Sequence, residues 1–281
     1  MKDTLFVLLQ YLLPHHALSR LVGKLTHCRW RPLKNALIRL FIRAYDIDLS
    51  EAVSADPDDY ACFNDFFTRA LKPGARPLPD DPATVVSPAD GKISQIGRLT
   101  GQWLIQAKGR DFSAAALLGD TDLGRTFEDG EFATIYLSPR DYHRVHMPYT
   151  GRLREMIHIP GRLFSVNDAT AEGGENLYAR NERVVCRFDT DAGPMAVVLV
   201  GALLVASIET VWHGVVTPPT GRKIRRWRYD DREIVLARGA ELGRFNMGST
   251  VIVLFPEETV VWCREAGQAV RMGETLGWVK G

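Results

Sequence analysis

The chain has 281 residues, of which 46% are hydrophobic and 25% are charged, and its net charge is +1 at neutral pH. This composition is typical of a folded soluble protein, and it excludes a disordered chain, a collagen-like chain and a polytopic membrane protein. The four cysteines lie far apart and form no Cys-x-x-Cys pair, so a reducing cytosol fits better than a disulfide framework or a zinc ribbon.

Residues 1–45 differ from the rest of the chain in charge. Eight basic residues and one acidic residue give this segment a net charge of +7, which leaves −6 for the remainder. Apolar residues recur there at helical spacing, in groups that begin at Leu5, Leu18 and Leu33. Apolar stripes between basic residues predict helices that lie on an anionic membrane surface. The alternative is a helical cap that packs on the main domain and keeps its basic side chains in water.

The longest apolar stretch, residues 5–13, is interrupted by Gln10 and ended by Pro14. It is far shorter than the roughly 20 residues that span a bilayer. One lysine precedes it and no small-residue cleavage site follows it, so we do not expect an export signal.

Residues 1–72 predict helices, and the segment 58–71 is the last of them before Lys72, Pro73 and Gly74 end the region. From about Thr84 onward, short β-rich runs alternate with Gly and Pro turns, which predicts a sheet or barrel with few helices. The predicted strands are 92–96, 103–106, 132–137, 183–188, 195–204, 250–255, 260–263 and 276–279.

The segments 87–93 and 271–277 resemble each other loosely, and both resemble the two turns of a lipoyl- or biotinyl-type barrel. A carrier domain of that type needs a modifiable lysine at a hairpin tip. Neither segment has a convincing one, so the carrier function is set aside while the barrel remains possible. Taken alone, residues 87–91 predict an ordinary turn, because Pro, Asp and Gly favour turns.

Two histidines occur three residues apart in the segment 136–148. The box-like pair Ser138 and Asp141 predicts a single helical turn, from which His143 and His146 would project at neighbouring positions. Histidines placed in this way serve as metal ligands or as acid and base in catalysis. No third ligand and no His-Glu-x-x-His motif is evident, so we expect no metal.

Gly248 and Ser249 stand at the start of an apolar run that continues to Phe255. Glycine permits a close approach of the backbone, and serine offers a hydroxyl nucleophile, although an ordinary turn has the same composition. The order Asp90, His146, Ser249 is compatible with a hydrolase triad, but the Gly-x-Ser-x-Gly elbow is absent from the sequence. The sequence also lacks a glycine-rich phosphate loop and a dinucleotide fingerprint.

Several segments, taken together and in order, resemble the bacterial membrane-associated phosphatidylserine decarboxylases. The resemblance covers roughly residues 60–281, whereas residues 1–60 resemble the family only in character. One departure is Met247, where the family usually has leucine, and this exchange nearly conserves side-chain volume. The segments that carry the resemblance are 63–69, 71–77, 87–92, 136–148, 161–167, 181–184, 200–202 and 245–256.

The resemblance implies a pyruvoyl enzyme that makes its own prosthetic group. Ser249 would attack the carbonyl of Gly248 and convert the peptide bond to an ester, and elimination and hydrolysis would then leave a pyruvoyl group at residue 249. The products would be a β chain of residues 1–248 and an α chain of residues 249–281. The pyruvoyl group would replace PLP as the electron sink, and no PLP signature is identifiable.

The resemblance also implies a role for each candidate residue. His146 would be the base that activates Ser249, and Asp90 would orient and stabilise that histidine. In turnover the substrate amine would form a Schiff base with the pyruvoyl carbonyl, carbon dioxide would leave, and phosphatidylethanolamine would be released. His143 would be the general acid that protonates the α-carbon, and a purely structural His143 is the alternative.

The expected fold is α+β, with amphipathic helices in a membrane-associating region of residues 1–75 and a β-rich, barrel- or sandwich-like catalytic domain of residues 76–281. The expected substrate is phosphatidylserine, and the expected partners are an anionic membrane surface and the two chains cut from one precursor. The resemblance also implies a homodimer. No nucleic acid is expected. The predicted location is peripheral, on the cytoplasmic side of the inner membrane. The main alternative is a serine hydrolase that uses Asp90, His146 and an intact Ser249, and a pyruvoyl decarboxylase of a soluble amino acid is another.

Overall fold

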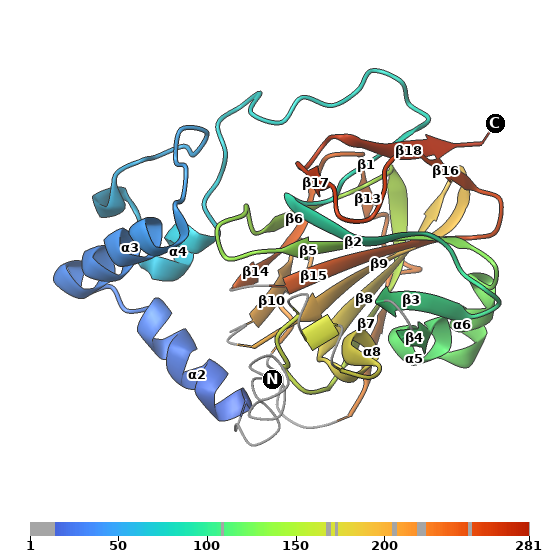
Figure 1. Ribbon diagram of the computed structural model, residues 1–281, viewed down its shortest axis with the longest axis horizontal. Helices are drawn as coiled ribbons and strands as arrows, with labels where there is room; N and C mark the ends of the chain where they lie inside the picture. The colour runs from blue at the N-terminus through green and yellow to red at the C-terminus, as the bar shows by residue number, and fades with distance from the viewer. Residues whose placement is uncertain are drawn as a thin grey trace.

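The computed structural model is shown in Figure 1. Two sequence features discussed above, the apolar stretch 5–13 and the dipeptide of Met247 and Gly248, lie outside the residues that the structure describes. The described residues are 15–107, 110–166, 170–171, 174–203, 207–217, 223–246 and 249–280.

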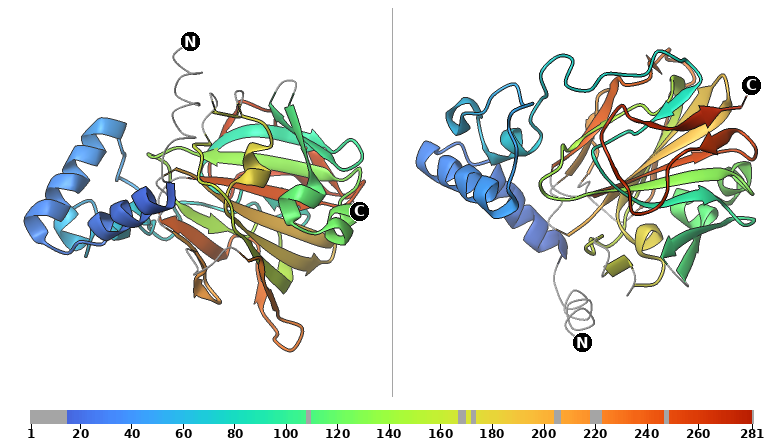
Figure 2. Two further views of the ribbon diagram at one scale, coloured as in Figure 1. Left: turned by 90° about the horizontal axis from the view of Figure 1, so that it is seen from below. Right: turned by 45° about the horizontal axis from the view of Figure 1, so that its top comes forward.

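The N-terminal region is helical, as the sequence predicts. Its elements are α2 (His15–Thr26), α3 (Arg31–Tyr45), the short 3₁₀ helix η1 (Pro57–Asp59) and α4 (Phe63–Phe67). A proline in the first turn of α3 fits its start, because the amide there has no intrahelical acceptor. These helices lie to one side of the sheets (Figures 1 and 2).

Helix α3 is attached to its neighbours largely through polar groups. Lys34 and Asn35 are buried, and the Lys34 ammonium donates to the carbonyl of Pro57 at 2.8 Å. The Asn35 amide donates to the Asp58 carboxylate at 2.7 Å. A small aromatic cluster around Ile38 completes the contact. On another face of the same helix, Leu40 is 66% exposed, so α3 buries polar groups and leaves part of its apolar surface uncovered.

The largest sheet has nine strands, and its paired neighbours run antiparallel. Strand β15 lies near its centre between β9 and β5. In spatial order the strands are β12 (Arg225–Arg228), β7 (Gly151–Ile159), β8 (Arg183–Thr190), β9 (Gly193–Gly201), β15 (Ser249–Phe255), β5 (Glu131–Leu137), β2 (Gly91–Arg98) and β17 (Ala269–Val270), with β13 (Val235–Leu236) also paired to β7.

Smaller sheets and short helices cover the two faces of this sheet. A four-stranded sheet has the order β11 (Gly214–Val215), β10 (Ser207–Thr210), β14 (Glu241–Asn246), β6 (Arg144–His146). A three-stranded sheet has the order β1 (Thr84–Val86), β18 (Thr275–Val279), β16 (Val260–Trp262), and β3 (Trp103–Ala107) pairs with β4 (Arg110–Ser113). The described helices of this region are α5 (Ala114–Leu118), α6 (Thr121–Thr126) and α8 (Leu177–Arg180).

Each face of the central strand belongs to a separate hydrophobic core. Ile252 and Leu254 pack with side chains of the helical layer, such as Leu117 and Tyr178. The residues of β15 that alternate with them pack toward the four-stranded sheet, where Phe245 is one partner of Val251 and Val253. The alternation follows from the two-residue period of a strand.

The α+β class is confirmed, and each of the eight predicted strands overlaps a strand of the structure. The sheets of the described residues are layered and open, so of the two predicted forms the sandwich-like one is correct and the closed barrel is not. The two loosely similar segments lie against each other. The Ser87 amide donates to the Glu274 carbonyl at 2.7 Å, and the Gly273 amide donates to the Ser87 carbonyl at 3.0 Å.

Candidate active site

Residue 249 begins the central strand of the largest sheet. Its backbone pairs with Leu137 at the end of β5 and with Gly201 at the end of β9. The preceding strand β14 runs beside the histidine segment, since the Phe245 amide donates to the carbonyl of His143 at 3.1 Å. The topology therefore brings the segments 137–146 and 245–249 together, although about 100 residues separate them in sequence.

His146 lies at the end of β6 in a buried, polar setting. Its Nδ1 is 2.8 Å from the carbonyl oxygen of Gly239, and its Nε2 is 3.0 Å from the hydroxyl of Tyr142. Because a carbonyl only accepts, Nδ1 carries the hydrogen and Nε2 accepts from the tyrosine. Burial lowers the pKa of His146, and it raises the pKa of Tyr142 to about 12. At neutral pH the pair is therefore a neutral imidazole and a neutral phenol.

Asp90 is held by a different set of groups. Its carboxylate accepts from Arg76 through Nε at 3.1 Å and Nη2 at 2.5 Å, and from the amide of Met272 at 2.7 Å. Arg76 also donates to Glu51 at 2.7 Å. Burial opposes the charge on Arg76, but the carboxylates of Asp90 and Glu51 outweigh it and hold the pKa of the guanidinium above its ordinary value.

Asp90 and His146 lie on adjoining segments without a direct hydrogen bond between their side chains. The amide of His146 donates to the carbonyl of Pro88 at 2.8 Å, which fixes the two segments side by side. Both ring nitrogens of His146 and both carboxylate oxygens of Asp90 have other partners. The predicted orienting contact of Asp90 is therefore not made in this structure, where the carbonyl of Gly239 orients the ring instead.

His143 is fully buried beside the N-terminal region. Its ring lies 4.0 Å from that of Phe67 on α4, measured between centroids. Its Nδ1 donates to the carbonyl of Asp141 at 2.8 Å, and its Nε2 has no hydrogen-bond partner among the described residues. Burial lowers the pKa of His143 to about 3, so Nε2 carries a free lone pair at neutral pH.

The predicted helical turn at the histidines is wrong. The carboxylate of Asp141 accepts from the amide and the hydroxyl of Ser138, both at 2.7 Å, and this closes a turn rather than starting a helix. The chain then enters β6, which pairs with β14 in extended conformation. His143 and His146 therefore do not project from one helical face, and they have separate surroundings.

Sequence reasoning missed several polar residues of the site. Tyr142 lies in the histidine segment and Arg76 in the segment 71–77, but the sequence assigns no role to either side chain. Asn246 directly precedes the dipeptide of Met247 and Gly248; its amide donates to Glu209 at 2.8 Å and to the Ser207 hydroxyl, and its oxygen accepts from Asn64 at 2.9 Å. A buried asparagine next to a glycine-serine pair was the only local signal for this anchor.

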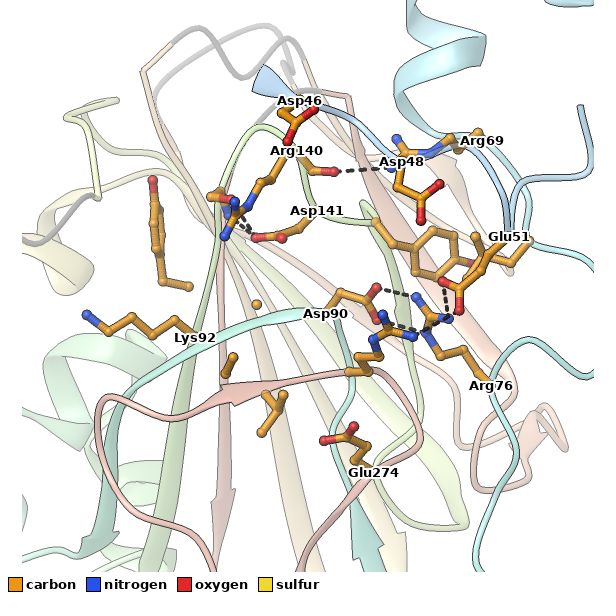
Figure 3. A pocket seen from close by; sticks show the side chains of 18 of the residues that line it. Asp46, Asp48, Glu51, Arg69, Arg76, Asp90, Lys92, Arg140, Asp141 and Glu274 are labelled. Carbon is orange, nitrogen blue, oxygen red and sulfur yellow. Dashed lines mark hydrogen bonds and ion pairs between the residues drawn. The ribbon is translucent and has the colours of Figure 1, made fainter. Parts of the chain in front are cut away.

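A cavity of about 630 Å³ lies between the N-terminal region and the edge of the sheet (Figure 3). Its lining is strongly charged and comes from both regions. Among the described residues no group of three His, Cys, Asp or Glu side chains could hold a metal ion. The side chains most relevant to its chemistry are Glu51, Arg69, Arg76, Asp90, Arg140 and Arg271.

The fold places residue 249, at the head of the central strand, beside a segment with two buried histidines, an arrangement that enzymes use for acid-base chemistry. The family model for phosphatidylserine decarboxylase matches residues 63–278, and a second model, described as PSD, matches residues 5–46. The chain therefore belongs to the phosphatidylserine decarboxylase family, as its motifs indicated.

Similar proteins cover almost the whole chain. The phosphatidylserine decarboxylase proenzyme of Pseudomonas entomophila is 58% identical over 282 residues, which is 98% of each chain. That of Ectopseudomonas mendocina is 58% identical over 283 residues and 99% of each chain. That of Bordetella avium is 59% identical over 279 residues, which is 98% of this chain and 95% of the relative.

Proposed function

We propose that this protein converts phosphatidylserine to phosphatidylethanolamine and carbon dioxide, with a pyruvoyl group that it generates from Ser249 by cutting its own chain after Gly248. The observation that carries the proposal is the position of residue 249. It opens the central strand beside the histidine segment, in a chain 58% identical to relatives named proenzymes. Such a name fits a precursor that is processed before it acts.

The residues near position 249 fit a small carbonyl group that works on an amine. Leu137 and Gly201, its neighbours in the sheet, carry no charge, and His143 offers an unpartnered ring nitrogen. A pyruvoyl group at this position would supply a carbonyl for the substrate amine and an electron sink for the loss of carbon dioxide.

His146 suits the role of base in the self-cleavage. A serine hydroxyl is a weak nucleophile until a base removes its proton. The hydrogen on Nδ1 is directed at the carbonyl of Gly239, so the lone pair of Nε2 is the one available for that proton. Tyr142 now donates to Nε2 and would have to release it. Asp90, held by Arg76, would stabilise the imidazolium through its nearby charge rather than through a direct hydrogen bond.

His143 is the proposed proton donor in the decarboxylation. The substrate arrives as an ammonium ion and must lose a proton before its nitrogen can attack a carbonyl. Burial lowers the pKa of His143 to about 3, so its ring is too weak a base to take the proton of the ammonium, and that proton would leave to water. His143 is proposed as the general acid that protonates the α-carbon. Its free Nε2 would have to be protonated in the substrate complex before it could act in this way.

The N-terminal helices suit docking on a lipid surface. A diacyl lipid is nearly insoluble as a monomer, so an enzyme that acts on it must reach the bilayer. Leu21, Trp30 and Leu40 are each about two-thirds exposed, and Arg39 and Arg43 are exposed beside them. An apolar face with exposed cations binds anionic membranes.

No helix of the described residues is long and apolar enough to span a membrane. Peripheral attachment at the cytoplasmic face of the inner membrane is the proposed location, and a homodimer stays a prediction.

Intact-mass spectrometry of the denatured protein tests the proposal. We expect two chains that divide between Gly248 and Ser249, with the smaller one about 17 Da lighter than a peptide that starts with serine. Ser249→Ala should give one uncut, inactive chain. His146→Ala should slow the cut, whereas His143→Ala should cut normally and lose decarboxylation. A stable single wild-type chain with esterase activity would favour the serine hydrolase, and a cut chain inactive on phosphatidylserine would refute the substrate.

A further inference from the structure

The cations that line the cavity differ in how they are neutralised. Arg76 is paired with Asp90 and Glu51, and Arg271 donates to Glu51 at 2.9 Å. These four side chains form a closed network whose charges balance. Figure 3 shows Arg76 between Asp90 and Glu51, and Arg69 beside Asp48. A ligand would have to break ion pairs to use Arg76 or Arg271.

Arg69 has no such partner. It is only 5% exposed, and its guanidinium lies 5.7 Å from the centre of the Phe66 ring. Asp48, Asp90 and Asp141 act on its charge from a distance, but none of the described carboxylates forms an ion pair with it. One nitrogen, Nη2, donates to the carbonyl of Arg140 at 3.2 Å, and Nη1 is buried without any hydrogen-bond partner. A buried charge is costly unless it is paired. A guanidinium that lines a cavity in this state is complementary to an anion that enters from outside.

Arg140 offers a second cation at the same place. It lies exposed on the turn that Ser138 and Asp141 close, and among the described residues it has no ion pair. The turn directly follows Leu137, the partner of residue 249 in the sheet. Adjacent strands lie about 5 Å apart, and a turn spans less than about 7 Å. An anion held at the turn would thus lie within one lipid head group of residue 249.

We propose that Arg69, assisted by Arg140, forms a subsite for the phosphodiester of a serine phospholipid head group. The proposal rests on the proposed function and adds the group that holds the substrate in place. The phosphodiester is the better ligand of the two anions, because an ion pair with the departing carboxylate would stabilise the ground state and oppose its loss. A planar guanidinium also matches phosphate oxygens in two-point contact.

The rest of the lining agrees with a head group that carries both signs of charge. Asp46 and Asp48 line the same cavity and would attract the ammonium of the arriving substrate. They follow α3 directly, so the cavity adjoins the element that we propose to dock on the membrane.

The test is calorimetric binding of dihexanoylphosphatidylmethanol, a short-chain lipid with a phosphodiester but no amine or carboxylate, below its micelle-forming concentration. The host is the full chain with Ser249→Ala, so the result does not depend on decarboxylation. We expect Arg69→Met to weaken binding about ten- to hundredfold and Arg69→Lys to weaken it less. Arg125→Met, which removes an exposed arginine of α6 far from the cavity, is the matched control and should change nothing.

O-hexanoylserine, which keeps the amine and carboxylate and lacks the phosphate, separates the two anions. Arg69→Met should leave the affinity for O-hexanoylserine unchanged. If the variant instead lost affinity for O-hexanoylserine and kept its affinity for phosphatidylmethanol, Arg69 would bind the carboxylate, and the proposal would be overturned. Equal binding of phosphatidylmethanol by all variants, or none by the host, would overturn it as well. If Arg69→Met does not fold, Arg140→Met provides the same comparison, with a smaller loss expected. Wild-type protein inactive on phosphatidylserine would instead refute the proposed function, whatever the binding result.

Discussion

The N-terminal helical region and the sheet region are built on opposite rules. In the sheets the interior is aliphatic, and side chains such as Val198 and Ile252 are completely buried. In the helical region Lys34 and Arg69 are buried, whereas Leu21 and Leu40 are mostly exposed. The first arrangement is that of an ordinary soluble core, and the second leaves apolar surface for a medium other than water.

The difference shows how a helical region with exposed apolar side chains can be attached to a sheet region without an apolar interface. Polar groups rather than an apolar core make many of the contacts between the two. The Asn64 amide donates to Asn246 at 2.9 Å, and Arg144 donates to the carbonyl of Thr68 at 2.9 Å. Because such contacts use little apolar surface, the helices keep theirs available while remaining aligned with the site.

The largest effect is expected where a charged contact between the regions is removed. Arg76→Met leaves Asp90 and Glu51 without their shared partner, and Asp90 is largely buried. We expect the free energy of unfolding to fall by about 3–5 kcal/mol in the uncut Ser249→Ala background, measured by urea unfolding. In the wild-type background the self-cleavage should slow, because Asp90 loses its fixed position.

Arg31→Met is the control for that prediction. Arg31 pairs with Asp58, but its side chain is 74% exposed, so the loss should stay below about 1 kcal/mol. Equal losses for Arg31→Met and Arg76→Met would show that the contact between the regions is no stronger than a surface ion pair.

A smaller effect is expected from acid. Burial lowers the pKa of His143 to about 3, with Phe67 of the helical region covering its ring, and burial also lowers the pKa of His146. Between about pH 6.5 and 3 the unfolded chain therefore binds protons that the native chain does not. Stability is fully present above pH 6.5 and falls by about 1.4 kcal/mol per pH unit for each fully titrating histidine.

His143→Phe should reduce that slope to the part contributed by His146, because residue 143 then binds no proton on unfolding. Urea unfolding of the uncut chain at pH 7, 6 and 5 measures it. If the unfolding free energy of His143→Phe depended on pH as steeply as that of the parent chain, the helical region would not exclude water from the His143 ring.

The smallest effect on stability is expected on the exposed face of α3. Leu40→Ser should change the free energy of unfolding by less than about 0.5 kcal/mol. It should nevertheless weaken sedimentation with anionic lipid vesicles about tenfold, because one leucine is no longer buried in the bilayer. Val261→Ser, at an exposed position of the sheet region, should leave vesicle binding unchanged. A stability loss near 2 kcal/mol for Leu40→Ser would indicate that this face packs on protein.

Local pattern predicts the strands whose hydrophobic content is continuous, but it misses others, among them β7 and β14, in which polar and apolar residues are mixed. The run 251–255 is completely buried, and its β-branched residues suit a central strand. The histidine turn was mistaken because Ser138 and Asp141 suit a helix cap and a closed turn equally well; the pairing of β6 with β14 decides between them.

The candidate site could be predicted only in its residue types. Asp90, His146 and Ser249 were chosen by chemistry and resemblance, but the partners that hold them were not visible. Asn64 and Asn246, for example, are 182 residues apart in sequence. The pairing of Asp90 with Arg76 in preference to His146 is likewise a product of tertiary packing, and no spacing rule encodes it.

The place of β15 has a consequence for reversibility. A cut before residue 249, as proposed, creates a chain end in the middle of a sheet, hydrogen-bonded to β5 and β9 on both sides. The small fragment would also supply β17 to the same sheet and β16 and β18 to another. Assembly would be unimolecular before the cut and bimolecular after it. The cut protein would then refold less readily than its precursor. Its refolding yield would depend on protein concentration, whereas the refolding yield of the uncut chain would not.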